Sequence, residues 1–83
     1  MDRPDIPTKV ESPEQLGALV RAVRQESDAD QVTAAGIAGV GVRFLGDLER
    51  GKASVRLGLV LRVLSRIGLE VWIAPRGWKP GSR

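Results

Sequence analysis

The chain has 83 residues, a formal net charge of +3, and neither cysteine nor histidine. At this length it forms one small domain, whose core is only just large enough to be stable. The missing residue types exclude disulfides, thiolate metal ligands, and the side chain most often used as a general base or a metal ligand. The composition therefore argues against an enzyme and predicts neither a metal nor a cofactor.

The sequence shows no feature of a secreted or membrane protein. No apolar run approaches the roughly 18 residues that a membrane span requires. The first eleven residues contain two prolines and mixed charge, with no apolar stretch of the kind that directs export. We expect a cytoplasmic protein that is not associated with a membrane.

Charge is distributed unevenly along the chain. Residues 1–42 carry four basic and seven acidic side chains, a net charge of −3, whereas residues 43–83 carry nine basic and three acidic ones, a net charge of +6. A basic half suits a polyanion such as DNA, and an acidic half suits a surface that faces away from it or meets a basic partner. The alternative interpretation is an ordinary solvated surface.

We expect an extended N-terminal arm over residues 1–11, followed by a helix. Ser12 can cap this helix, Pro13 suits its first position, and Gln15 can complete a capping box. Apolar side chains then recur at helical spacing as far as about Glu26, at Leu16, Leu19, Val20 and Val23.

Two short helices separated by a glycine turn form the next part of the pattern. The first is expected over residues 31–38, capped by Asp30, and the second over residues 42–50, preceded by Gly41. Gly39 can take the positive φ that ends the first of them. This order of elements is typical of a helix-turn-helix DNA reader.

A fourth helix, a short strand and a tail complete the chain. Ser54 is expected to cap the helix, and Gly68 to end it in the left-handed conformation. The alternation that follows predicts a strand over residues 69–73, which Pro75 stops, and residues 76–83 form a flexible basic tail. The apolar stripe of the helix consists of Leu57, Val60, Leu61, Leu64 and Ile67.

The pattern is carried by residues 16–24 (LGALVRAVR), Gln31, residues 38–40 (AGV) and residues 44–52 (FLGDLERGK), followed by a last helix that runs straight into a strand. With these motifs the chain resembles the Xre/Cro family of bacterial and phage repressors, and within it the HipB-like antitoxins that partner HipA-like kinase toxins. The resemblance implies a mostly α fold of four to five helices. The helix-turn-helix domain would occupy residues 12–75 and end in one C-terminal β-strand that pairs across a dimer.

The resemblance also implies roles for three polar residues. The positions of Arg24 and Glu49 form an internal ion pair in this family, which fixes geometry more than it adds stability. Gln31 matches the glutamine at the start of the second helix, where its amide and the nearby backbone N–H groups can hold a phosphate. The alternative for Arg24 and Glu49 is that they are two solvated surface charges. The alternative for Gln31 is that it is an ordinary helix residue.

Arg43 is the best candidate for reading a base, because it faces away from Leu45 and Leu48 and can bind guanine with two hydrogen bonds. Val42 beside it can touch a thymine methyl group. Asp47 can hold Arg43 in place, accept from a cytosine amine, or repel phosphate. Phosphate contacts are expected from Arg50, Lys52 and Arg56, with solvated surface charges as the alternative. Gly41 completes the expected DNA-binding set.

The strand needs a partner, since a lone strand leaves a row of unpaired backbone groups. A second copy of the same strand supplies it, and HipB-like proteins are similar in this respect. The interface would then be formed by Leu69, Val71 and Ile73. Pairing within the chain, with residues 6–10, is the alternative. A dimer would place two reader helices about one DNA turn apart, as an inverted repeat requires.

The sequence thus predicts a sequence-specific DNA-binding repressor of the bacterial nucleoid, which represses its own operon as the antitoxin of a HipA-like kinase. Trp78 and Arg76 in the tail are expected to dock on that toxin, with folding back on the domain as the alternative. Two other functions stay open. One is a free-standing Xre-type repressor without a toxin. The other is a toxin-binding module with weak or no DNA binding, which would be consistent with Asp28, Asp30, Gly36, Gly41 and Gly46.

Overall fold

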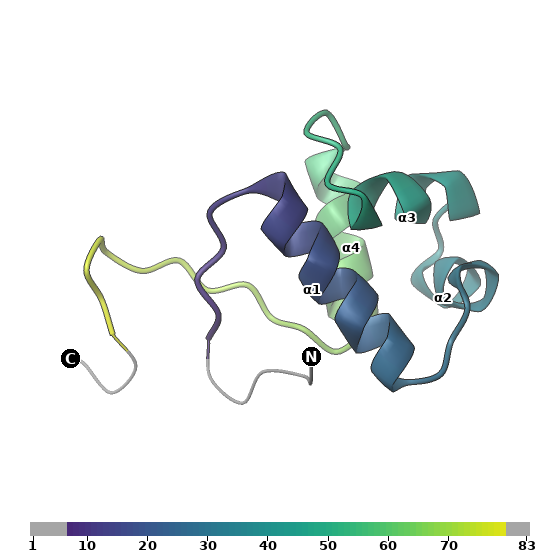
Figure 1. The fold of residues 1–83 in the computed structure, drawn as a ribbon, viewed down its shortest axis with the longest axis horizontal. Coiled ribbons are helices and arrows are strands. Elements are labelled where there is room, and N and C mark those ends of the chain that lie inside the picture. The colour runs from purple at the N-terminus through teal and green to yellow at the C-terminus, as the bar shows by residue number, and fades with distance from the viewer. Residues whose placement is uncertain (1–6, 80–83) are drawn as a thin grey trace.

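The computed structural model describes residues 7–79, and these form four helices and no strand (Figure 1). The parts of the predicted arm and tail in residues 1–6 and 80–83 lie outside the described residues. The first three helices agree with their predicted ranges to within one residue. In chain order the helices are α1 (Pro13–Glu26), α2 (Gln31–Ala38), α3 (Val42–Glu49) and α4 (Leu57–Arg66).

The first two helices begin at the predicted caps. The Ser12 hydroxyl accepts from the backbone N–H of Gln15 at 3.1 Å, and the Asp30 carboxylate accepts from that of Thr33 at 2.7 Å. The return bond of the expected capping box is displaced by one residue. The Gln15 side chain accepts from the backbone N–H of Glu11, at 2.6 Å, and not from that of Ser12.

The start of α4 differs from the prediction. Its N-cap is Arg56, whose side chain makes no capping hydrogen bond, and Ser54 lies in a turn before the helix. Val55 is packed against the hydrophobic core. Because this side chain must reach the core, the chain stays extended as far as Arg56 and the helix starts later than its local signals suggest.

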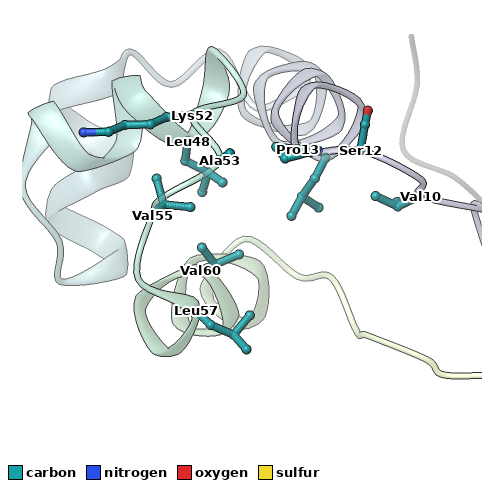
Figure 2. A pocket seen from close by; sticks show the side chains of 10 residues that line it. Val10, Ser12, Pro13, Leu48, Lys52, Ala53, Val55, Leu57 and Val60 are labelled. Carbon is teal, nitrogen blue, oxygen red and sulfur yellow. The ribbon is translucent and has the colours of Figure 1, made fainter.

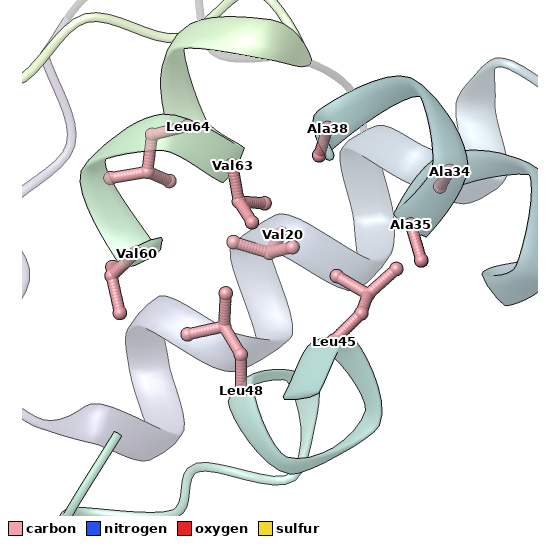
Figure 3. Packing of buried hydrophobic residues seen from close by; sticks show 9 residues of the cluster. All are labelled: Val20, Ala34, Ala35, Ala38, Leu45, Leu48, Val60, Val63 and Leu64. Carbon is pink, nitrogen blue, oxygen red and sulfur yellow. The ribbon is translucent and has the colours of Figure 1, made fainter. Parts of the chain in front are cut away.

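The four helices meet around Val20 of α1, which is completely buried (Figure 3). α2 contributes three alanines, whose small side chains let it lie close to α3 and α4. Burial of each larger side chain is worth about 1.5–3 kcal/mol. The buried cluster consists of Val20, Ala34, Ala35, Ala38, Leu45, Leu48, Val60, Val63 and Leu64.

The buried face of α4 is rotated from the predicted stripe. Val63 is fully buried, although it was not assigned to the stripe. Leu57 and Leu61 were assigned to it and are 69% and 45% exposed. The reason is that α4 turns the face of Val60 and Val63 toward α2, and the described part of the chain leaves Leu57 and Leu61 uncovered.

The segment after α4 is irregular. Gly68 takes the expected left-handed conformation, φ +90°, and Leu69 packs against the core. The chain then leaves the helices (Figure 1), and residues 69–73 form no strand within the described residues. In the alternative pairing, residue 6 lies outside the described range and residues 7–10 form no strand. A strand at 69–73 needs a partner that the described residues do not supply.

A buried ion pair ties three helices together. The Arg24 guanidinium on α1 donates twice to the Glu49 carboxylate on α3, from Nε at 2.6 Å and from Nη2 at 2.8 Å. Arg24 Nη1 also donates to the carbonyl of Ala29 at 2.8 Å, and Gln31 Nε2 donates to Glu49 at 3.1 Å. The structure thus brings Arg24 and Glu49 together, as the family resemblance implies, and adds the first residue of α2.

Burial of Glu49 would by itself raise the pKa of its carboxyl, because the charged form loses solvation. The hydrogen bonds from Arg24 and Gln31 outweigh this effect, so the pKa of Glu49 lies below its ordinary value of 4.5. The hydrogen bond to Glu49 in turn raises the pKa of Arg24. Both groups are therefore charged at neutral pH.

We expect the ion pair to make stability depend on pH in the acidic range. Since the pKa of Glu49 is lower in the folded chain than in the unfolded one, its carboxylate stabilises the fold above pH 4.5, and this contribution is lost as the pH falls through the folded pKa. The urea concentration at the unfolding midpoint of the native chain should decrease as the pH is lowered from about 5 to about 3. The Glu49→Gln variant should be less stable at neutral pH and should show a shallower pH dependence.

Asp30 provides the control, because the backbone hydrogen bond from Thr33 also lowers the pKa of that carboxyl. The Asp30→Asn variant should therefore lose only the contribution of Asp30 to the slope of stability against pH. The contribution of Glu49 should remain. Equal slopes for the native chain and Glu49→Gln would show that the buried pair is not the origin of the effect.

Candidate nucleic-acid interface

The turn between α2 and α3 sets the orientation of α3. Gly39 ends α2 in the left-handed conformation, φ +72°, and the backbone N–H of Val40 donates to the carbonyl of Ala35 at 3.0 Å. Arg62 of α4 donates to the carbonyl of Gly39 at 3.2 Å. The turn is therefore fixed by its own backbone and by the last helix.

Packing of one side of α3 leaves the other side exposed. Leu45 and Leu48 are 1% and 2% exposed and hold α3 against the core. Val42 and Arg43 lie at the exposed start of the helix, and Gly41 precedes them as its N-cap. Within residues 7–79, the side chain of Arg43 makes no hydrogen bond or ion pair. Its guanidinium can therefore be offered to a ligand without loss of an internal contact.

Cations cluster where α3 ends. Arg50 Nη2 lies 2.6 Å from Asp47 Oδ1, and Lys52 Nζ lies 3.6 Å from Asp47 Oδ2. Arg56 is exposed at the start of α4. Of the three roles left open for Asp47, the structure thus corrects that of holding Arg43 in place, because both oxygens of Asp47 face Arg50 and Lys52.

Gln31 lies at the start of α2 as predicted, but its amide points inward. Gln31 Nε2 donates to the buried Glu49, and the backbone N–H of Thr33 is used by the Asp30 cap. Two donors expected to hold a phosphate are therefore already committed inside the protein. Gln31 acts here as a link between α2 and α3.

Three residues that the sequence analysis did not assign also shape this surface. Arg62 caps the turn, as described above. A Cβ atom at Gly17 would collide with the backbone carbonyl of Leu48, so glycine lets α1 touch α3 directly. Gly46 is buried beneath Arg50, and a Cβ atom there would lie 3.2 Å from Arg50 Nη1. The spacing of four residues between Gly46 and Arg50 is the sequence signal that could have revealed this contact.

A second surface, at the end of α4, is apolar. Val71, Trp72 and Ile73 are 57%, 73% and 96% exposed, and Trp78 is 40% exposed. A shallow hollow of about 460 Å³ lies between α4 and this segment. Its lining is formed by Leu61, Leu64, Ser65, Leu69, Glu70, Val71 and Trp72.

A hollow of about 370 Å³ lies between the start of α1, the loop after α3 and the start of α4 (Figure 2). Its walls are apolar apart from Ser12 and Lys52, and Figure 2 shows the Lys52 amine pointing away from it. Over the described residues there is no group of side chains that could hold a metal ion. None of the four helices is long and apolar enough to cross a membrane.

The comparisons with known proteins agree with this geometry. No family model matches the chain. Two solved structures have the same fold. A HipB(S29A)–O2 20mer complex matches at a TM-score of 0.76 and 21% identity, over 86% of this chain and 99% of that one. A HipA–HipB–O2–O3 complex matches at a TM-score of 0.75 and 22% identity, over 83% of this chain and 97% of that one.

A curated relative supplies the sequence comparison. The uncharacterized HTH-type transcriptional regulator y4mF of Sinorhizobium fredii is 45% identical over 69 residues, which cover 83% of this chain and 91% of the relative. This level of identity over nearly the whole of both chains, together with the exposed α3 of the helix-turn-helix, shows that the chain belongs to the family of HTH-type transcriptional regulators.

Proposed function

We propose that the chain is a sequence-specific DNA-binding repressor that reads the major groove with α3. The observation that carries this proposal is the exposed start of α3, where Arg43 is free of internal contacts, combined with cations at its far end. An arginine in the first turn can bind guanine O6 and N7, and Val42 can contact a thymine methyl group. Phosphate contacts would come from Arg50, Lys52 and Arg56.

We also propose that the chain acts as a dimer in which residues 69–73 of two copies pair as antiparallel strands. Leu61, Val71 and Ile73 support this proposal, because an apolar surface of this kind is normally covered. The unpaired backbone of the segment would gain its hydrogen bonds from the second copy. Two α3 helices would then face an inverted repeat.

The partner that we propose is a HipA-like kinase toxin, with the chain as its antitoxin and the repressor of their shared operon. The support is the fold, which matches HipB alone with DNA and HipB within a HipA–HipB–DNA complex. The tail offers a contact for such a partner. The side chains of Trp78 and Arg76 are exposed beyond the helices, and tryptophan is a favoured interface anchor.

DNA reading by α3 is tested with two variants. Arg43→Ala should weaken binding of an operator duplex by about 1–3 kcal/mol and relax the preference at one base pair of each half-site. Lys52→Ala should weaken binding to every sequence and lower the salt slope by about one per subunit. Fluorescence anisotropy over a salt series measures both. Arg66→Ala, which removes an exposed arginine from the end of α4, is the control. If Arg43→Ala retains the native preference, α3 does not read the bases as proposed.

Dimer formation through residues 69–73 is tested by Ile73→Asp and Val71→Pro. Aspartate places a charge in the apolar interface, and proline removes an N–H from the strand ladder. Light scattering should show monomers, and operator affinity should fall sharply because the two half-sites no longer cooperate. Ile37→Asp, which changes an exposed side chain of α2, should remain dimeric. If Ile73→Asp remains dimeric, the interface is formed instead by the last helix, α4, through Leu57 and Leu61.

The role of the tail is tested by deletion of residues 76–83. Binding to a HipA-like kinase encoded beside the chain, measured by calorimetry, should weaken, while dimerisation and DNA binding persist. Trp78→Ser should reproduce the loss, and Ile37→Ser, which changes an exposed apolar side chain of α2 outside the proposed interfaces, serves as the control. Unchanged kinase affinity after deletion would place the contact elsewhere. If no such kinase is encoded beside the chain, the free-standing repressor is the function that remains. If the chain binds the kinase but not DNA, it is a toxin-binding module.

A further inference from the structure

Two cations proposed to contact phosphate, Arg50 and Lys52, are already paired with a carboxylate of α3. Asp47 lies between Arg50, at 2.6 Å, and Lys52, at 3.6 Å, and each of its oxygens serves one of them. The Asp47 side chain is 22% exposed, whereas those of Arg50 and Lys52 are 70% and 55% exposed. Water and ligands can therefore reach the cations, and the pairs can exchange.

Gly46 leaves room for Arg50 in this position. The guanidinium folds back along α3 over Gly46, where a Cβ atom would lie only 3.2 Å from Nη1. A side chain at this position would require the guanidinium to shift by a few tenths of an ångström. The sequence Gly46-Asp47 thus provides both the space and the charge that hold Arg50 against the helix.

Asp47 also lies one helical turn after Arg43, and residues four apart share a face of a helix. On a bound duplex its carboxylate would therefore lie near the base edges. A carboxylate can accept a hydrogen bond from the amine of cytosine. Without such a donor, it would be a desolvated, unpaired negative charge beside DNA, which is unfavourable.

We propose that Asp47 is a specificity-determining residue. Arg50 and Lys52 would leave Asp47 and contact phosphates only where a base amine can take their place at the carboxylate. This inference rests on the proposed function of α3. On arbitrary DNA, release of the cations would leave the carboxylate without a partner. Arg50 and Lys52 therefore stay partly paired with Asp47, and the DNA is bound weakly. On a site with an amine in the right place, the carboxylate exchanges two cations for the base, and the cations reach the phosphates.

The experiment compares Asp47→Asn with the native chain on two duplexes, one selected by the native chain from a random-sequence library and one with the same bases scrambled. An exposed ion pair changes an equilibrium by a factor of up to about five. With two subunits, we expect the affinity for the scrambled duplex to rise about 5- to 20-fold. The affinity for the selected duplex should rise less, or fall, so that the ratio of the two affinities decreases. Glu70→Gln, which removes an equal charge beyond α4, should leave the ratio unchanged.

Two results would overturn the inference while leaving DNA binding intact. An equal gain on both duplexes would mean that Asp47 only repels phosphate. A gain that persists when Arg50 and Lys52 are both replaced by methionine would mean that it does not act through them. A native chain that binds neither duplex would instead overturn the proposed function itself. Thermal unfolding of each variant checks that the fold is retained.

Discussion

The ion pair of the buried Glu49 carboxylate is the interaction on which the position of α3 depends. The carboxylate lies at the last residue of α3, and its partners come from α1 and from the first residue of α2. The core beneath is built largely from alanine, valine and leucine, whose contacts have no fixed direction. The two parallel hydrogen bonds from Arg24 have a definite direction and are stronger than neutral ones. They fix the angle at which α3 is presented, and removal of one partner of such a pair costs about 3–5 kcal/mol.

Elements with local signals could be predicted from the sequence, and elements shaped by distant contacts could not. Asp30 and Gly39 define the two ends of α2 by themselves, and the structure agrees with both. The start of α4 depends on Val55 reaching the core, which no neighbouring residue reveals. The choice of Val63 over Leu57 for burial likewise depends on where α2 lies. A strand at residues 69–73 would depend on a second copy, so one chain leaves it irregular.

The same distinction applies to the candidate site. The pairing of Arg24 with Glu49, 25 residues away, could be expected because a whole family pattern implies it. The pairing of Asp47 could not, because Arg43, Arg50 and Lys52 all lie within about one and a half turns of it on or just after the helix. Spacing allows each of these contacts, and only the folded chain shows that Arg50 and Lys52 are the partners. The inward turn of Gln31 has a similar cause, since a buried carboxylate attracts its amide more strongly than water does.

The two carboxylates of α3 therefore have different physical roles, although they are two residues apart. Glu49 has a side chain that is 3% exposed, so its hydrogen bonds are shielded from solvent. Asp47 is 22% exposed, and its bonds to flexible cations can be exchanged for a ligand. A helix of eight residues offers few side chains to a base edge, so each of them would carry much of the specificity. If α3 reads DNA as proposed, the buried pair would set the angle of the helix and the exposed pairs would set its charge, and pairing of two copies would multiply the resulting discrimination.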